Sequence, residues 1–407
     1  MKTRGGPPDT AVRFAVRHGV IPQGAPIIRA HGEDRPMGAY YVGLDVHSRE
    51  TVFVIQDPTG AVIGRGALPT TPEAFARMCD QYQLPAGTPV ALETGTSAFY
   101  VARALSALDL KPIVIDAHEV RLKAHRPGQK SDRRDAFELC DGLRRDLYRS
   151  IVHIPSPAIS TLRTALSRRR HFIRIQTAEV NATKRLLRGA GWLGGKRGSL
   201  RNASGWERLI DALASEPTLQ THTRFHYAVW QQAGEQVHAI DHLLGDLGRG
   251  FRDDVRRLET VPGVGPIVAL TAVAVFADVE RFGSAKHAAS YAGLVPSTYQ
   301  SADRDCHGHI TKRGSAELRT MLCEAAHHAR RPSHPLHPYF LKLCARRGYK
   351  SAVVAVAHRL CRVLYALLRD GTDFQPSRLG IEEGPFTQTV TRRFRLTPKS
   401  AGRLALV

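Results

Sequence analysis

A short acidic segment holds the first candidates for chemistry in this chain. Lys130-Ser-Asp-Arg-Arg-Asp-Ala reads as a helix that starts at Ser131, which places Asp132 and Asp135 on one face. Three apolar residues share that face: Ala136, Leu139 and Leu143. Two carboxylates on a face directed into the protein interior would repel each other and lose hydration unless a cation lies between them. The segment therefore predicts a divalent metal site.

Two further acids lie in or at the end of apolar strands. Asp45 interrupts Val42-Gly-Leu-Asp-Val, and Glu93 ends Val90-Ala-Leu-Glu. Each acid has a simpler explanation, because Asp45 could pair with an arginine, Glu93 could cap the next helix, and Asp132 could interact with a helix dipole. Together the four acids have the arrangement of an RNase H-like nuclease. Such hard oxygen ligands select Mg²⁺ or Mn²⁺, and two ions about 3.5–4 Å apart can polarise a phosphate.

The elements that must position these acids follow from hydrophobic periodicity. Residues 40–47, 51–57 and 61–64 predict three antiparallel strands with a turn at 57–60. A helix around 75–82, a strand at 89–93, a helix at 98–108 and a strand at 112–116 follow. We therefore expect a mixed α/β sheet with helices packed on it.

Composition indicates a polyanionic partner. The 407 residues carry a formal net charge of +21, for which nucleic acid is the commonest explanation and an anionic membrane surface the competing one. We expect no membrane association, because no apolar run approaches the roughly 20 residues that span a bilayer. The six scattered cysteines favour reduced thiols in the cytoplasm over disulfides or structural zinc.

A basic helical region follows the α/β part. Residues 155–255 read mostly as helix, with a Gly-rich loop expected at 189–205. From Ser160 through Arg201 there are eleven Lys or Arg and a single acid, Glu179. A solvated helical face is the simpler interpretation, but acids that could pair at i+4 are missing, so a phosphate-facing surface is favoured. The candidate contacts are Arg168, Arg169, Arg170, Lys184 and Arg185.

A glycine turn precedes the last helices. Val261-Pro-Gly-Val-Gly-Pro predicts a helix–hairpin–helix in which the second helix begins at Pro266. Gly263 and Gly265 would permit close backbone approach, and the N–H groups of the second helix could hold a phosphate. A plain helix connector is the alternative. Further helices are expected at 316–329 and 351–368.

The chain resembles the transposases of the IS110/IS1111 insertion-sequence family, which are bridge-RNA-guided recombinases. The resemblance rests on the segments around the four acids and on several segments nearer the C-terminus: Val261-Pro-Gly-Val-Gly-Pro, Ala289-Ser-Tyr-Ala-Gly-Leu-Val-Pro, Tyr299-Gln-Ser and Ile310-Thr-Lys-Arg-Gly-Ser. It implies that Asp45, Glu93, Asp132 and Asp135 form a RuvC-like catalytic tetrad that binds Mg²⁺ or Mn²⁺.

The resemblance also implies a nucleophile that no local pattern singles out. The family uses a serine of its C-terminal domain to attack DNA, and the matching residue is Ser301, although Ala302 follows where a glycine is common. A hydrogen-bonding turn serine is the simpler interpretation from the residues alone. Lys312 and Arg313, just downstream, could hold a phosphate. Zinc is a weaker alternative, which would use Cys306-His-Gly-His with His327 and His328.

The expected protein is a mobile-element recombinase. We expect a basic extension (1–37), a RuvC-like domain (38–152), a helical, coiled-coil spacer (153–255), a mainly helical C-terminal domain (256–378) and a polar tail (379–407). The resemblance implies donor and target double-stranded DNA, an element-encoded guide RNA, and a dimer that assembles into a tetramer at the nucleoid. The rivals are a Holliday-junction-type nuclease that uses only the acids, and a noncatalytic nucleic-acid-binding protein.

Overall fold

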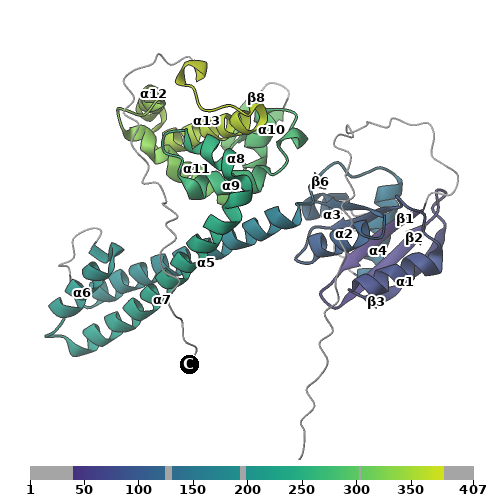
Figure 1. The fold of residues 1–407 in the computed structure, drawn as a ribbon, viewed down its shortest axis with the longest axis horizontal. Coiled ribbons are helices and arrows are strands. Elements are labelled where there is room, and N and C mark those ends of the chain that lie inside the picture. Colours follow the sequence, from purple (N-terminus) through teal and green to yellow (C-terminus); the bar gives the residue numbers. More distant parts are fainter. Residues whose placement is uncertain (1–39, 124–130, 193–198, 302–303, 380–407) are drawn as a thin grey trace, which may run out of the picture. The chain divides into compact units, whose positions relative to one another are not determined.

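The computed structural model describes residues 40–123, 131–192, 199–301 and 304–379 (Figure 1). Two compact units divide between Ile154 and Pro155. The first is a mixed α/β unit and the second is helical apart from one hairpin. Each unit has its own hydrophobic core, and each is described separately below.

The first unit is built on a six-stranded sheet in the order β3-β2-β1-β4-β5-β6. The strands are β1 (Tyr41–Val46), β2 (Glu50–Gln56), β3 (Val62–Pro69), β4 (Pro89–Glu93), β5 (Lys111–Ile115) and β6 (Ile151–Val152). The expected meander is confirmed, because β1, β2 and β3 pair antiparallel. Strands β1, β4 and β5 are parallel, which brings the carboxyl ends of β1 and β4 to one edge of the sheet.

Helices cover both faces of this sheet. The helices are α1 (Pro72–Tyr82), α2 (Ala98–Ser106), α3 (Ala117–Lys123) and α4 (Asp132–Arg144). On one face, side chains of α1 and α2 such as Phe75 and Leu105 pack on Val42 and Leu44. On the other face α4 packs through Ala136 and its neighbours. Strand residues alternate between faces, so every second residue of β1, including Asp45, lies on the α4 side.

The short edge strand β6 was not expected, and a buried acid holds the chain that leads to it. Glu119 of α3 accepts hydrogen bonds from the backbone N–H groups of Arg149 (3.0 Å) and Ser150 (2.6 Å). Lys123 pairs with the same carboxylate at 2.9 Å. Desolvation favours the protonated acid, but the hydrogen bonds from Lys123, Ser150 and Arg149 outweigh it and lower the pKa of Glu119 to about 2.

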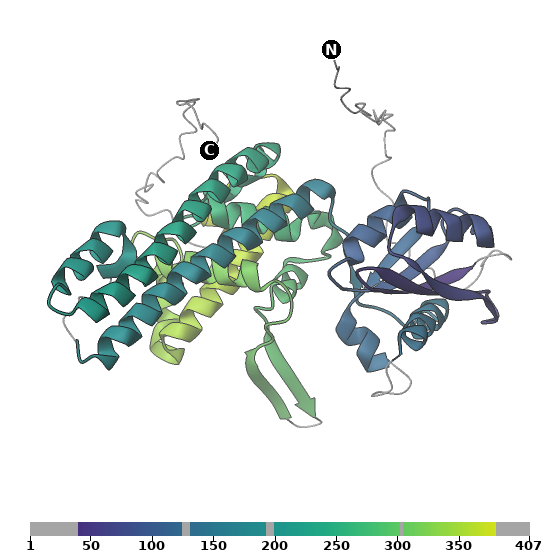
Figure 2. The ribbon, with the colours of Figure 1, turned by 90° about the horizontal axis from the view of Figure 1, so that it is seen from below.

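Two long helices dominate the first half of the second unit. They are α5 (Pro157–Gly189) and α7 (Pro217–Leu247), which lie side by side (Figure 2). They run antiparallel, because Arg169 of α5 pairs with Asp241 of α7 while Glu179 pairs with the earlier residue His226. Helix α6 (Ala203–Ala212) follows η1 (Ser199–Arg201), so the expected loop 189–205 is wrong at its end. Asn202 caps α6 through Gly205 N, which starts the helix inside the Gly-rich stretch.

The second half of this unit has its own core. It contains α8 (Arg252–Glu259), α9 (Pro266–Phe276), α10 (Ala285–Tyr291), α11 (Ala316–Ala326), α12 (His337–Arg347) and α13 (Tyr349–Asp370). Short 3₁₀ turns lie between them, including η4 (His327–Arg330), which replaces the expected end of the helix 316–329. The hairpin of β7 (Pro296–Ser301) and β8 (Arg304–Ile310) was not expected and extends from the helices (Figure 2).

Helix α13 corrects the expectation that no apolar run reaches membrane-spanning length. By length and composition it is able to cross a bilayer, but half of its apolar window is buried inside the unit. Val356, Leu360 and Leu364 belong to the core, with at most 1% exposure. Packing around these side chains accounts for the apolar character of α13 as that of a core helix.

Candidate active site

Asp45 and Glu93 lie at neighbouring positions of one sheet edge. The parallel register of β1 and β4 pairs Leu44 with Leu92, so Asp45 and Glu93 are the next residues on the two strands. Both lie on the side of the sheet that α4 covers, because Leu44 and Leu92 face the opposite core. The N-cap residue of the next helix, α2, is Ser97. The two strands therefore present two acids to the same helix.

A histidine that sequence reasoning missed joins Asp45 to α4. His47 Nε2 lies 3.2 Å from Asp45 Oδ2 and 3.5 Å from Asp132 Oδ2. One ligand atom from each of these three residues lies within 4.8 Å of the others. His47 follows Asp45 by two positions, so alternation along the strand was a signal that could have identified it. The structure thus brings together Asp45, His47 and Asp132.

The acidic helix has the expected start and the expected apolar face. Helix α4 begins at Asp132 with Ser131 in the N-cap position, and Ala136 and Leu139 are buried. The expectation that both acids point into the interior is wrong for Asp132, whose side chain is 55% exposed. Asp132 is the first residue of the helix and so stands at the rim of the packed face, whereas Asp135, one turn later, is half-buried.

A glycine permits the close approach of β1 and α4. A Cβ placed on Gly43 would lie 2.8 Å from Cys140 Cβ and still closer to Ala136 O and Cys140 N. The Cys140 thiol contacts Tyr41 O at 3.1 Å. Burial raises the pKa of Cys140 to about 12, which keeps this thiol neutral and makes it a poor metal ligand. At Gly43 the backbone of β1 lies against the backbone of α4, and this close packing brings the start of α4 to the end of β1.

The donor set fits a hard divalent cation. Asp45 Oδ2 is shielded from solvent although its side chain is 18% exposed overall. A desolvated carboxylate oxygen close to a second carboxylate is stabilised by a cation. Two carboxylates and one imidazole suit Mn²⁺, and carboxylates alone suit Mg²⁺. The residues present therefore fit the metal that the acidic pattern predicts, with His47 as an added candidate ligand.

The structure places Ser301 outside the unit that holds the acids. Ser301 ends β7 and pairs with Arg304 of β8, so its backbone lies at the tip of the hairpin. Ala302 and the side chains of 298–307, including Cys306, lie outside the described residues. Among the described residues the acidic group is the sole metal-type cluster found, and His327 is hydrogen-bonded to Tyr349 instead.

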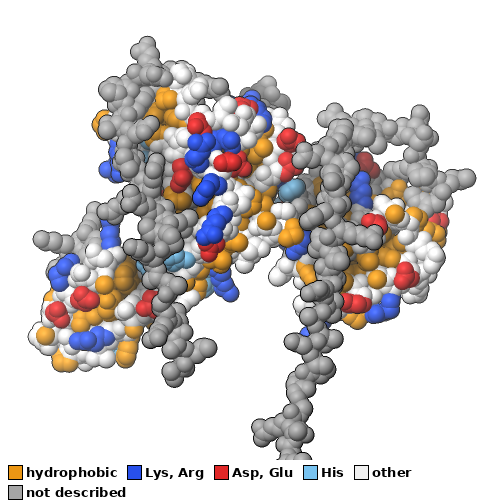
Figure 3. All heavy atoms as spheres, viewed as in Figure 1, with side chains coloured by type: hydrophobic (Ala, Val, Ile, Leu, Met, Phe, Trp, Pro, Cys, Tyr) orange, Lys and Arg blue, Asp and Glu red, His pale blue; other side chains and the backbone are white. Residues whose placement is uncertain are grey.

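Some of the basic residues predicted on α5 interact with acidic side chains, and others are exposed. Arg169 pairs with Asp241 at 2.6 Å, so α7 supplies an acidic partner although α5 has none at i+4 of Arg169. Burial raises the pKa of Glu317, and the positive charge of Arg170 partly opposes that increase. Arg168 and Arg185 are exposed. Figure 3 shows Lys and Arg side chains beside Asp and Glu on the visible face of this unit.

Lys184 lines a shallow groove between α5 and the segment that follows it. Trp230 of α7 and Arg201 of η1 line the same groove. Lys184 is half-buried and Arg201 exposed, so one aromatic ring and two cations border an open surface. Such a combination is compatible with contact to nucleic acid.

The glycine turn before α9 is partly a packing feature. Helix α9 begins at Pro266 as expected. Gly263 has φ +86°, and a Cβ there would lie 3.0 Å from His328 Cβ, so protein fills the space beside it. His334, which is 5% exposed, holds the turn through a 3.0 Å contact to Pro262 O. Only Gly265 has open space where a side chain would be.

Two basic residues downstream of the hairpin are exposed. Lys312, with φ +54°, and Arg313 lie between β8 and α11 and are both accessible. Arg319 of α11 instead donates from Nη1 to Ala292 O at 2.9 Å and joins α11 to the end of α10. Lys312 and Arg313 are therefore the accessible cations of this segment.

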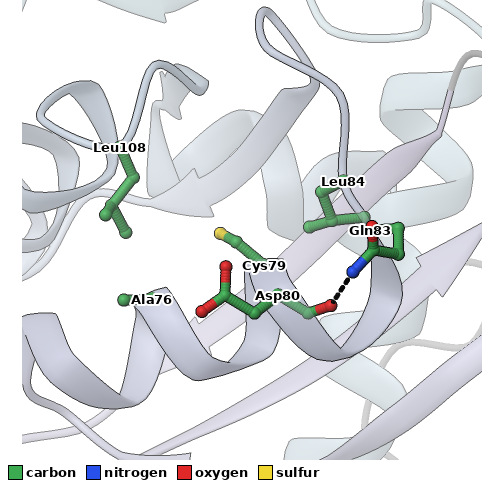
Figure 4. A pocket seen from close by; sticks show the side chains of 6 residues that line it. All are labelled: Ala76, Cys79, Asp80, Gln83, Leu84 and Leu108. Atoms are coloured by element: carbon green, nitrogen blue, oxygen red, sulfur yellow. Dashed lines mark hydrogen bonds between the residues drawn. The ribbon is translucent and has the colours of Figure 1, made fainter.

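A small pocket of the first unit lies away from the acids. It is lined by Cys79 and Asp80 of α1, by Gln83 and Leu84 just after that helix, and by Leu108 after α2. Gln83 Nε2 donates to Asp80 O at 2.6 Å (Figure 4). Cys79 and Leu108 belong to the core on the α1–α2 side of the sheet, opposite α4. Burial raises the pKa of the Cys79 thiol, which disfavours the nucleophilic thiolate.

Comparisons with known proteins point to one family. A family model described as "Transposase IS116/IS110/IS902 family" matches residues 255–340, and one described as "Transposase", of the DEDD type of IS110, matches residues 42–191. Together they cover more than half of the chain.

Named relatives agree with these models. A probable family 20 transposase of Pseudomonas aeruginosa is 28% identical over 303 residues, which are 70% of this chain and 86% of that protein. The transposase for insertion sequence element IS1111A of Coxiella burnetii is 27% identical over 61% of this chain and 69% of its own length. A pilin gene-inverting protein of Moraxella lacunata is 32% identical over 29% of this chain and 37% of its own length.

Proposed function

Because the chain belongs to the IS110 family of transposases, we propose that the acids at the ends of β1 and β4 and at the start of α4 form its DNA-cleaving site. The observation that carries this proposal is the convergence of Asp45, His47 and Asp132 within 4.8 Å. Glu93, in register beside Asp45, and Asp135, one helical turn after Asp132, complete the proposed set. The antiparallel meander followed by parallel strands supports an RNase H-like, RuvC-like assignment for this unit.

We propose that Asp45, Glu93, Asp132 and Asp135 hold Mg²⁺ or Mn²⁺. A bound divalent cation would polarise the scissile phosphate and stabilise the charge of a leaving oxygen. The protein's own contribution is positional: Gly43 allows α4 to approach β1 closely, and the sheet register fixes Asp45 beside Glu93. Asp132 and His47 are about half exposed, which leaves this edge accessible to a large substrate.

We further propose that Ser301 is the nucleophile of strand exchange. When its Oγ forms an ester with the scissile phosphorus, the bond between that phosphorus and a deoxyribose oxygen breaks. The deoxyribose oxygen leaves as a hydroxyl and takes up a proton in place of the one that Oγ releases, so the number of phosphoester bonds is unchanged. Rejoining by the reverse substitution therefore needs no ATP. This role rests on the family resemblance around Tyr299-Gln-Ser, and a tip position in the β7–β8 hairpin is compatible with it.

The remaining parts of the proposal concern nucleic-acid contacts and assembly. We propose that exposed cations of the helical unit, Arg168, Arg185, Lys312 and Arg313, contact phosphates, with the α8–α9 turn acting as a helix–hairpin–helix. Following the resemblance, a guide RNA would select donor and target DNA, and a dimer would assemble into a tetramer at the nucleoid. The domain division at 37, 152, 255 and 378 belongs to the same proposal.

The test separates the acids from the serine. Asp45→Asn should abolish Mg²⁺-dependent cleavage while duplex binding persists, and Ser301→Ala should abolish the covalent protein–DNA adduct seen on a denaturing gel. Asp80→Asn, an exposed acid of α1, and Ser297→Ala, in the same hairpin, are the matched controls.

Two results would contradict parts of this proposal. Normal cleavage and rejoining by Ser301→Ala would favour a nuclease that uses the acids alone. Metal-independent behaviour, with no effect of Asp45→Asn, would favour a noncatalytic binding protein.

A further inference from the structure

A stretch of the second unit lacks acids altogether. Between Glu324 and Asp370 there are nine Lys or Arg and no Asp or Glu. On α5, by contrast, the acids of α7 neutralise part of the charge, as Asp241 does for Arg169. The acid-free stretch runs through η4 and α12 and along α13 up to Asp370, which pairs with Arg369 at 2.7 Å.

Five of these cations form a group that we call the α12–α13 basic cluster. Arg330 ends η4 and Arg331 follows it, Arg346 and Arg347 end α12, and Lys350 lies in the first turn of α13. All five are exposed. Within the described ranges, none of them has an ion-pair partner. The five side chains therefore concentrate positive charge that the described part of the protein does not neutralise.

Contacts between aromatic rings hold the three elements of the cluster together. His327 Nδ1 lies 2.7 Å from Tyr349 Oη, and the two rings stack with centroids 5.8 Å apart. Phe340 of α12 meets Tyr349 edge-on at 5.7 Å. Gly348, with φ +78°, allows the sharp passage from α12 into α13. These contacts place the start of η4 beside the α12–α13 junction and engage the rings within the protein.

We propose that the α12–α13 basic cluster binds the phosphates of duplex DNA, as a contact surface separate from α5. This inference rests on the proposed function, since it assumes a protein that handles DNA. Exposed like charges repel one another, and a polyanion neutralises them while releasing counterions. The first turn of α13 adds N–H groups and the positive end of a helix dipole beside Lys350.

The chemistry of the cluster favours the backbone of a duplex over other polyanions. Stacking of unpaired bases needs an accessible aromatic face, and the Tyr349 ring already stacks on His327. Insertion into an anionic bilayer needs an accessible apolar face, and the apolar residues of α13, such as Val356 and Leu360, are buried in the core. The five exposed cations lie on or directly beside helices, an arrangement that suits phosphate contacts without base readout.

The experiment compares two triple variants of the full chain that have the same net charge. The cluster variant carries Arg346→Gln, Arg347→Gln and Lys350→Gln. The control variant carries Arg208→Gln, Arg224→Gln and Lys286→Gln, which are exposed residues of α6, α7 and α10 in the same unit. The affinity for a short DNA duplex of arbitrary sequence is measured over a range of salt concentrations.

We expect the slope of log affinity against log salt to become shallower by about 3 for the cluster variant, because each removed cation leaves one phosphate with its counterions. Its affinity at physiological salt should fall by roughly tenfold or more, and the control variant should change less. Arg346→Lys with Arg347→Lys keeps the charge and should retain the wild-type slope, which separates loss of charge from loss of folding.

Three results would overturn the inference. The first is a wild-type slope in a folded cluster variant. The second is a cluster variant that loses binding to vesicles of anionic phospholipid while duplex binding is unchanged. Failure of the wild-type chain to bind any duplex would refute the proposed function itself, and the inference with it, so the two failures are distinguishable.

Discussion

Replacing Gly43 with alanine tests whether the close approach of β1 and α4 positions the acids. A Cβ at this position would lie 2.8 Å from Cys140 Cβ and nearer still to two backbone atoms of α4, whereas ordinary contact begins at 3.4 Å. Because backbone atoms cannot rotate aside as a flexible side chain does, α4 must move away from the sheet by roughly 1 Å.

This movement should lower both stability and activity. Overpacking of this kind costs about 1–3 kcal/mol in the free energy of unfolding. In a unit of this size each kcal/mol lowers Tm by roughly 4 °C. The same movement carries Asp132 and Asp135 with the helix, and a displacement of about 1 Å from productive geometry lowers a rate by roughly 100-fold. Duplex binding by the helical unit should not change.

Two quantities are measured: the free energy of unfolding of the first unit in denaturant, and the rate of Mg²⁺-dependent cleavage of a DNA substrate. Gly95→Ala is the matched control, because no atom lies within 4 Å of a Cβ at that position, and its stability should stay within about 0.5 kcal/mol of wild type. If Gly43→Ala were as stable and as active as the wild type, the close contact would not position the acids, and the reasoning would be wrong.

Individual contacts support three more predictions. His47→Ala should weaken Mn²⁺ binding by roughly tenfold or more, measured by calorimetry, and an unchanged affinity would exclude the imidazole as a ligand. Glu119→Gln should lower the free energy of unfolding at neutral pH. The pKa of Glu119 is about 2 in the folded protein and 4.5 ordinarily, so the ionised carboxylate stabilises the fold fully above pH 4.5. The difference in free energy of unfolding between wild type and variant should therefore shrink as pH falls from 4.5 towards 2. A difference that persisted in acid would contradict this assignment. Arg168→Gln should make the salt dependence of duplex binding shallower by about 1 without a change in stability, whereas Arg169→Gln should lower stability by roughly 1 kcal/mol, and the reverse pattern would refute our division of these arginines.

Local patterns predicted most of the first unit. Strand 89–93 has the predicted bounds, and α4 begins directly after Ser131 as its capping pattern indicated. Pro266 likewise marks the start of α9. These signals depend on a few neighbouring residues, since alternation, caps and a proline at the first helical position act within one or two turns. Elements without such signals, such as β6 and the β7–β8 hairpin, were missed.

What the sequence did not reveal depends on contacts between distant residues. The partner of Arg169 lies on α7, 72 positions further along the chain, so a count of acids near α5 could not detect it. The apolar length of α13 reflects burial in a core assembled from several helices, which composition alone does not distinguish from a membrane segment. The depth of Asp132 was overestimated, because periodicity gives the face of a helix but not where the covering sheet ends.

The candidate site was predictable to a similar extent. Asp45, Glu93 and Asp132 were selected because charges in or beside apolar elements are costly, and the structure places all three at one sheet edge or against it. His47 has no such cost in a polar hairpin, so its distances to two acids, rather than its sequence context, made it a candidate; the alternation from Asp45 is the one sequence signal that points to it. Ser301 came from the family resemblance alone, and its role stays a prediction.

The half-exposed position of Asp132 and His47 has a consequence for how a polymer reaches the acids. A reaction centre at the bottom of a tunnel has to be threaded from a free end, so it degrades strands from their termini. A centre on an open rim can be approached sideways at any point along a continuous strand. Closed circular DNA, which offers no terminus, should therefore be as good a substrate for this protein as a linear fragment.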